Sequence, residues 1–164
     1  MHIEFREINE NDLQEVLSIY TYYVENTTFS FHMHSLTAEE MRCLVFFDNP
    51  KYKAYVMLDR EAICGYMILS QFGVREAYDE TGQIAVYLKC GYTGKGIGTR
   101  AISFIEQVAV KNKFHVLIAT ICAENTGSIR LFESVGYEKC AHYKQAGYKF
   151  GRRLDVVAYQ RILS

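Results

Sequence analysis

The chain has 164 residues, a length that fits one domain spanning residues 1–164. Its 18 basic and 19 acidic residues leave a net charge of −1. We therefore expect no nucleic-acid partner, because nucleic-acid-binding surfaces carry excess positive charge. No apolar run reaches the roughly eighteen residues that cross a membrane, and the polar start of the chain does not match a secretory signal. The five cysteines include no C-x-x-C pair, which indicates reduced thiols, a cytoplasmic location and no metal site.

The first half of the chain predicts a strand, two helices and a strand hairpin. Residues 2–8 alternate between apolar and polar side chains, as a half-buried strand does. The next helix has its apolar face at Leu13, Val16, Leu17, Tyr20 and Val24. Thr37 and Glu40 have the spacing of a capping box that opens a second helix, ending near residue 47. Strands over 53–58 and 62–70 then flank a short turn.

The second half of the chain predicts strands that alternate with helices. After a polar loop over 74–82 we expect a strand over 83–89, a helix after the glycine-rich segment 90–98, a strand over 115–121, a helix over 126–135 that Gly136 ends, and strands over 137–148 and 154–163. The resulting order, β-α-α-β-β-β-α-β-α-β-β, is typical of a mixed α/β domain.

The loop between the strand 83–89 and the next helix is the most informative segment. Its glycines let the backbone approach a ligand, and the first amides of a helix have no internal partners, so they hold phosphate oxygens. A P-loop is excluded because Gly96 follows Lys95 where Ser or Thr is required, and G-x-G-x-x-G fails because the glycines read G-x-G-x-G. The spacing Thr93-Gly94-Lys95-Gly96-Ile97-Gly98 fits the [QR]-x-x-G-x-[GA] pyrophosphate loop of acetyl-CoA-dependent transferases, with only the first position departing. A glycine-rich turn without a ligand is the alternative.

Four segments in chain order carry a family resemblance. They are Ile19-Tyr20 through Thr28, Val86-Tyr87-Leu88 with the glycine loop, Asn125-x-x-Ser128-x-x-Leu131-x-x-x-x-Gly136-Tyr137, and Gly147-Tyr-Lys-Phe-Gly-Arg-Arg-Leu-Asp155. Together they resemble the GNAT N-acetyltransferase superfamily, and more closely its phosphinothricin acetyltransferase-like branch. The resemblance implies an α/β (α+β) GNAT fold with a mostly antiparallel sheet of about seven strands, a splayed fourth and fifth strand pair, and four flanking helices.

The resemblance also implies acetyl-CoA as co-substrate and no metal. The pantetheine arm would pair with the backbone of Val86, Tyr87 and Leu88, and the Leu88 amide would stabilise the oxyanion. The pyrophosphate would lie on Thr93, Gly94, Lys95, Gly96, Ile97, Gly98 and Thr99, with Lys95 or Arg100 at the outer phosphates. Asn125 and Ser134 match cofactor-contacting positions; the alternatives for them are an ordinary helix cap and a solvated helix surface.

Two positions depart from the chemistry of the family. Where the branch has a glutamate as general base, this chain has Gln83, and where many members have a tyrosine acid it has Phe132. An amide does not take a proton near neutral pH, although it can orient a water. We expect a water chain that ends on a carboxylate of the preceding loop, at Glu80, Asp79 or Glu76.

The acceptor side is read from the same resemblance. Phe31, Arg75 and Tyr78, together with Phe29, would approach the acceptor, and the branch acetylates small amino-acid analogues such as phosphinothricin. Asp79 occupies a position where the branch has a basic residue, which disfavours an anionic acceptor, so a polyamine-like or peptide amine stays open.

The sequence thus predicts an N-acetyltransferase that moves the acetyl group of acetyl-CoA to the primary amine of a small amino-acid-like acceptor. The amine would attack directly and pass through a tetrahedral intermediate, and the resemblance implies a homodimer. The alternative is an acyl-CoA-binding module with weak or no catalysis, and Gln83 and Phe132 are the reasons to consider it.

Overall fold

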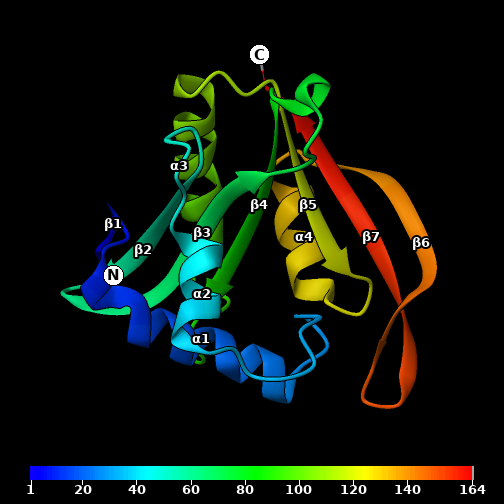
Figure 1. The fold of residues 1–164 in the computed structure, drawn as a ribbon, viewed down its shortest axis with the longest axis horizontal. Coiled ribbons are helices and arrows are strands. Elements are labelled where there is room, and N and C mark those ends of the chain that lie inside the picture. Colours follow the sequence, from blue (N-terminus) through cyan, green and yellow to red (C-terminus); the bar gives the residue numbers. More distant parts are fainter. Residues whose placement is uncertain (164) are drawn as a thin grey trace.

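The computed structural model describes residues 1–163, in which one sheet of seven strands has the order β1-β2-β3-β4-β5-β7-β6 (Figure 1). The strands are β1 (Ile3–Glu7), β2 (Lys53–Asp59), β3 (Ala62–Gln71), β4 (Thr81–Leu88), β5 (Val116–Cys122), β6 (Glu138–Lys149) and β7 (Arg152–Ile162). Every neighbouring pair is antiparallel except β4 and β5, which are parallel. The predicted strand content and the mostly antiparallel sheet are confirmed.

Helices cover both faces of this sheet (Figure 1). They are α1 (Leu13–Asn26), α2 (Ala38–Val45), α3 (Ile97–Lys111) and α4 (Thr126–Ser134), with short 3-10 turns at Glu10–Asp12 and Glu76–Tyr78. Residues of α1 and α2 bury one face in a core that includes Val16 and Met41, while α3 packs on the other face with Ile105. The predicted order of elements is confirmed, and none of the helices within residues 1–163 is long and apolar enough to cross a membrane.

Among the predicted boundaries that differ from the structure, two have a clear physical reason. The second helix ends at Val45 rather than near residue 47, because Phe46 already has an extended backbone. β4 starts at Thr81 rather than at Gln83, since Thr81 and Gly82 pair with β5 and Gly82 also pairs with Gln71 of β3. This pairing comes from another part of the chain, so the local polar composition of the segment gave no sign of it.

The parallel pair β4–β5 opens after three rungs. Thr81, Gly82 and Gln83 pair with residues 116–118, and beyond them no pairing joins the two strands. The rest of β4 keeps its antiparallel partner β3, whereas β5 keeps β7. This confirms the predicted splay and leaves one edge of each strand facing a gap.

The close packing of β3 on β4 depends on Gly65. A Cβ atom at this position would lie 2.6 Å from the carbonyl oxygen of Tyr87, a backbone atom that cannot move aside alone. We predict that Gly65→Ala lowers the free energy of unfolding by about 1–3 kcal/mol because it overpacks the site. Urea denaturation of both proteins measures the difference.

Gly127, at the start of α4, is the matched control. No atom lies closer than 4.0 Å to its would-be Cβ, and alanine favours a helix over glycine by up to about 1 kcal/mol. Gly127→Ala should therefore leave stability unchanged or raise it. Equal destabilisation by both substitutions would contradict this account of Gly65.

Candidate active site

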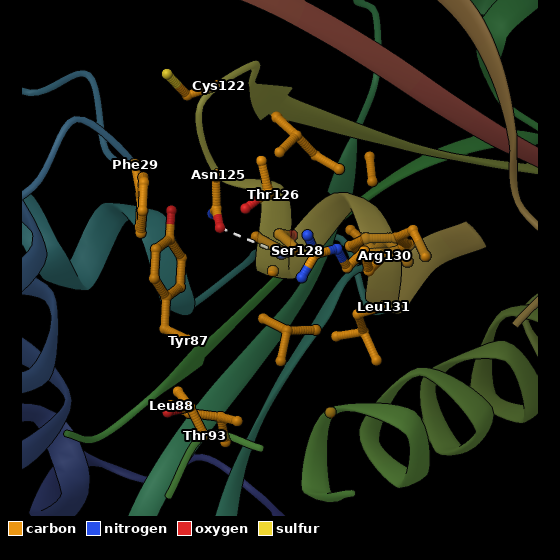
Figure 2. A pocket seen from close by; sticks show the side chains of 18 of the residues that line it. Phe29, Tyr87, Leu88, Thr93, Cys122, Asn125, Thr126, Ser128, Arg130 and Leu131 are labelled. Carbon is orange, nitrogen blue, oxygen red and sulfur yellow. Dashed lines mark hydrogen bonds between the residues drawn. The ribbon is translucent and has the colours of Figure 1, made fainter. Parts of the chain in front are cut away.

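A cavity of about 700 Å³ opens where β4 and β5 separate. Its walls come from β4, the glycine loop, β5 and α4, and from α1 with the segment that follows it (Figure 2). Among the sequence-predicted cofactor residues, those that line it are Val86, Tyr87, Leu88, Thr93, Gly94, Gly96, Gly98, Thr99, Asn125 and Ser134. The fold thus gathers two motifs that lie far apart in the sequence around one space.

Other predicted residues lie outside this lining. The Lys95 ammonium lies over the Tyr92 ring, 5.4 Å from its centroid, and Ile97 is buried in the core. The lining also does not include the residues proposed for catalysis and acceptor binding at Gln83, Glu80, Phe31, Arg75 and Tyr78.

The backbone of β4 turns polar groups toward the gap. The Lys89 amide donates to the Cys64 carbonyl at 2.8 Å, which makes these two residues a hydrogen-bonded pair across β3 and β4. Because such pairs alternate along an antiparallel ladder, Leu88 and Val86 direct their amides away from β3. On that side β4 has no strand partner beyond Gln83, so the amides face the cavity.

Tyr23 of α1 holds the end of β4 in place. Its hydroxyl donates to the Leu88 carbonyl at 2.5 Å, and its ring packs edge-on against Tyr87. The carbonyl of Leu88 is thereby occupied, whereas its amide faces the open side. Burial raises the pKa of Tyr23 above its usual value, so the phenol stays protonated and keeps donating.

The glycine loop places the N-terminal amides of α3, which have no side-chain hydrogen-bond partner among the described residues, at the cavity. Gly94 and Gly96 have φ values of 73° and 77°, which side chains other than glycine rarely adopt. Gly96 is the N-cap of α3 and no side chain caps this end, so its first amides lack side-chain partners. Such an end favours an anion.

The nearby cations are placed differently from the prediction. Arg130 of α4 lines the cavity, whereas the Arg100 guanidinium donates to the Ile3 carbonyl at 2.9 Å. The Arg130 side chain reaches into the space beside Ser128 and Leu131 (Figure 2). Arg130 is therefore the cation at this end of the cavity.

Asn125 and Ser134 already make local hydrogen bonds. The Asn125 side chain caps α4 by accepting from the Ser128 amide at 3.2 Å (Figure 2), and the Ser134 hydroxyl donates to the Leu131 carbonyl at 2.7 Å. The capping role that sequence offered for Asn125 is thus present, and it leaves the amide nitrogen of the side chain free to face the cavity that it lines.

The other end of the cavity is aromatic. Phe29 and Tyr87 face each other there, with Cys122 nearby (Figure 2). Tyr87 stacks on Tyr66 with ring centroids 5.1 Å apart, and burial raises the pKa of Tyr87 well above its usual value. This end therefore offers flat apolar surfaces and protonated phenols.

One carboxylate belongs to this end of the lining. Glu124 accepts two hydrogen bonds from Arg152, at 2.6 and 2.7 Å, and one from the Thr28 hydroxyl at 2.6 Å. These donors lower the pKa of Glu124 to about 2. Glu124 is thus a permanent anion near neutral pH and does not take up a proton from an amine.

Gln83 and Phe132 replace the base and the acid that the family resemblance implies. Gln83 lies on the last paired rung of β4 and β5, and Phe132 is buried against Tyr137 while lining the cavity. Glu80 precedes β4, where its carbonyl accepts from the His115 amide at 2.7 Å and its side chain is exposed. Within residues 1–163, no three His, Cys, Asp or Glu side chains lie close enough together to hold a metal ion.

Sequence reasoning missed Tyr23, Glu124 and Arg130 as lining residues. Tyr23 lies inside the quoted N-terminal motif and Arg130 inside the α4 motif, but neither motif fixes which side chain faces the gap. Glu124 directly precedes Asn125, and its position at the end of β5 was the available signal.

Comparisons with known proteins agree with this geometry. The family described as acetyltransferase (GNAT) domain matches residues 5–158. A phosphinothricin N-acetyltransferase of Streptomyces coelicolor is 31% identical over 158 residues, which cover 94% of this chain and 92% of the relative.

Two solved structures share the whole fold. A GNAT superfamily phosphinothricin acetyltransferase from Sinorhizobium meliloti, in complex with AcCoA, has a TM-score of 0.92 and 30% identity over 100% of this chain and 90% of its own. A ribosomal-protein-alanine N-acetyltransferase from Brucella melitensis has a TM-score of 0.88 and 32% identity over 98% and 99% of the two chains. The chain belongs to the GNAT family of acetyl-CoA-dependent N-acetyltransferases, in the branch of the phosphinothricin N-acetyltransferases.

Proposed function

We propose that this protein transfers the acetyl group of acetyl-CoA to the α-amine of a small amino-acid-like acceptor. The observation that carries the proposal is the cavity at the β4–β5 split, which has free helix amides at one end and an aromatic wall at the other. The relative from Streptomyces is named for phosphinothricin, an amino-acid analogue, which supports this acceptor class.

The residues present fit a bound CoA thioester. The amides of Val86 and Leu88 are directed to the gap, where they would pair with the pantetheine arm and the acetyl carbonyl. The loop Thr93 to Thr99 and the N-terminus of α3 would hold the pyrophosphate, with Asn125 and Ser134 on the facing helix. Bound acetyl-CoA supplies the activated acetyl group.

The proposed chemistry needs no covalent enzyme intermediate. The amine attacks the thioester carbon, the Leu88 amide donates to the oxygen that gains charge, and collapse of the tetrahedral intermediate releases CoA. Gln83 would orient a water at the closed end of the split, and a water chain ending on Glu80 would carry the proton away only after the free amine has attacked. The protonated phenol of Tyr87 is the proposed hydrogen-bond donor to the leaving thiolate.

The acceptor would lie against Phe29 and Tyr87, with Phe31, Arg75 and Tyr78 farther out. An arginine in the cavity would bind a carboxylate through paired donors, but Arg75 does not line it. The aromatic wall therefore favours acceptors whose side chain carries no charge. The peptide amine implied by the name of the Brucella structure is the second candidate.

The first experiment combines binding and turnover. We expect calorimetric titration to show micromolar acetyl-CoA binding, and thiol release to show turnover with methionine sulfone but little with spermidine. Adding methionine sulfone amide and a short peptide separates free amino acids from peptide-like acceptors. Light scattering of the same sample tests the proposed homodimer, which has twice the chain mass.

Each outcome of this experiment has a meaning. Binding without release of CoA for any amine would favour the acyl-CoA-binding module over the enzyme. No acetyl-CoA binding would refute the proposed function altogether.

Arg130 provides a test of the cavity end that has the free amides of α3, where the phosphates of acetyl-CoA would bind. Because Arg130 lines the cavity and Lys95 does not, we predict that Arg130→Gln weakens acetyl-CoA binding about tenfold, the scale of one charge-assisted hydrogen bond. Lys95→Gln, the matched control, should change Kd by about twofold or less. A larger effect at Lys95 than at Arg130 would contradict this assignment.

The pH profile tests the missing base. The cavity lining contains no histidine, and its carboxylate Glu124 has a pKa of about 2, so no lining carboxylate takes up the proton near neutral pH. We predict that kcat/KM rises with pH until the acceptor amine itself loses its proton, above about pH 8.

Gln83→Glu should change this profile and Gln83→Ala should not. A carboxylate at position 83 would take the proton at lower pH, so activity would level off earlier in the titration. A wild-type profile that is already flat from about pH 6 upward would mean that the protein holds an efficient base.

A further inference from the structure

The segment 27–31, which follows α1, forms one wall of the cavity through Phe29. Two polar residues of this segment are buried, since Ser30 is 3% exposed and Thr28 is 6% exposed. On one side, the Ser30 hydroxyl donates to the Tyr20 hydroxyl of α1 at 2.7 Å. A connecting segment this buried needs partners for its backbone, because unpaired polar groups are costly away from water.

Lys149 supplies one of these partners from the opposite side. Its side chain is 2% exposed, and its ammonium donates to the Ser30 carbonyl at 2.6 Å. Within residues 1–163 no carboxylate forms a salt bridge with it, and burial lowers its pKa. The ammonium also lies over the Phe150 ring, 5.1 Å from the centroid. The Lys149 ammonium has no ion-pair partner among the described residues, so its hydrogen bond to the Ser30 carbonyl is the polar contact that holds it to segment 27–31.

Arg152 reaches the same segment through Glu124. The paired hydrogen bonds from Arg152 fix the carboxylate, which accepts from the Thr28 hydroxyl. The three groups come from β7, the turn between β5 and α4, and segment 27–31. A bidentate contact of this kind fixes orientation as well as distance.

Gly147 adds a packing contact between strand β6 and segment 27–31. A Cβ at this position would lie 2.6 Å from the Phe31 ring, so only glycine lets the ring pack on β6. Gly147, Lys149 and Arg152 all belong to the C-terminal motif for which the sequence gave a resemblance and no role.

We propose that Lys149 and Arg152 are positioning residues that lock segment 27–31 onto the β6–β7 hairpin and thereby set the acceptor wall of the cavity. Within residues 1–163 neither side chain forms a hydrogen bond or salt bridge with β4 or the glycine loop, so we expect the lock to act on the acceptor and not on acetyl-CoA. This inference rests on the proposed function for its kinetic consequence, although the lock itself is a property of the fold.

Lys149→Met tests the lock because methionine keeps the length of the side chain and removes the donor. We expect the acceptor KM to rise about tenfold, the effect of losing one buried hydrogen bond, while the Kd for acetyl-CoA stays within about twofold. Lys149→Arg should restore part of the loss. Lys144→Met is the matched control on the same strand, where the side chain is exposed, and should have no effect.

Hydrogen exchange gives a readout that needs no turnover. Amides of residues 27–31 should exchange faster in Lys149→Met than in the wild type, with those of α3 unchanged. If Lys149→Met does not fold, Thr28→Val gives a second test. It removes the hydrogen bond from Thr28 to Glu124, and the expected rise in acceptor KM is smaller.

The outcomes separate the two proposals. A wild-type protein without turnover would refute the proposed function. Hydrogen exchange of residues 27–31 in Lys149→Met would still show whether the lock exists. Unchanged acceptor KM and unchanged exchange in Lys149→Met would refute the lock, as would an equal loss of acetyl-CoA affinity, which would show a general loss of structure.

Discussion

The site depends on one constraint, which is that the parallel pairing of β4 with β5 ends after three rungs. A continued ladder would satisfy the amides of Val86 and Leu88 with carbonyls of β5 and fill the cavity with backbone. Because pairing stops, each strand keeps its outer partner for stability and presents an unpaired edge inside the molecule. Unpaired buried amides are unfavourable unless a ligand or water meets them, so the same feature that makes the cavity also makes it a binding site.

The sequence predicted those parts of the site whose chemistry is local. The glycines at 94 and 96 lie two positions apart in the chain and are required by the positive φ angles of one loop, and the Asn125 cap involves a residue three positions away. Tyr23 could not be predicted, because its bond to the Leu88 carbonyl joins residues 65 positions apart. Lys95 shows the opposite case, since it is in the right motif but lies over Tyr92 outside the lining.

The two ends of the cavity share β4 but otherwise draw on different parts of the chain. The end with free helix amides comes from β4, α3 and α4, which are consecutive apart from β5. The aromatic end is lined by Phe29 of the segment after α1 and by Tyr87 of β4, and the Lys149–Ser30 bond, which spans 119 positions, ties that segment to the C-terminal hairpin. Under the proposed function, changes in the first part would alter how the acetyl donor binds, whereas changes in the second would alter which acceptors are taken. A shared donor and variable acceptors can thus evolve on one fold almost independently.

The permanent charge on Glu124 and the amide at Gln83 have a consequence for chemoselectivity. An enzyme without an efficient proton acceptor acts on whatever fraction of its substrate is already the free base. At neutral pH a terminal α-amine has roughly 300 times more free base than a lysine side chain, given their ordinary pKa values. Under the proposed function, proton affinity alone would therefore disfavour acetylation of lysine residues of other proteins by about this factor.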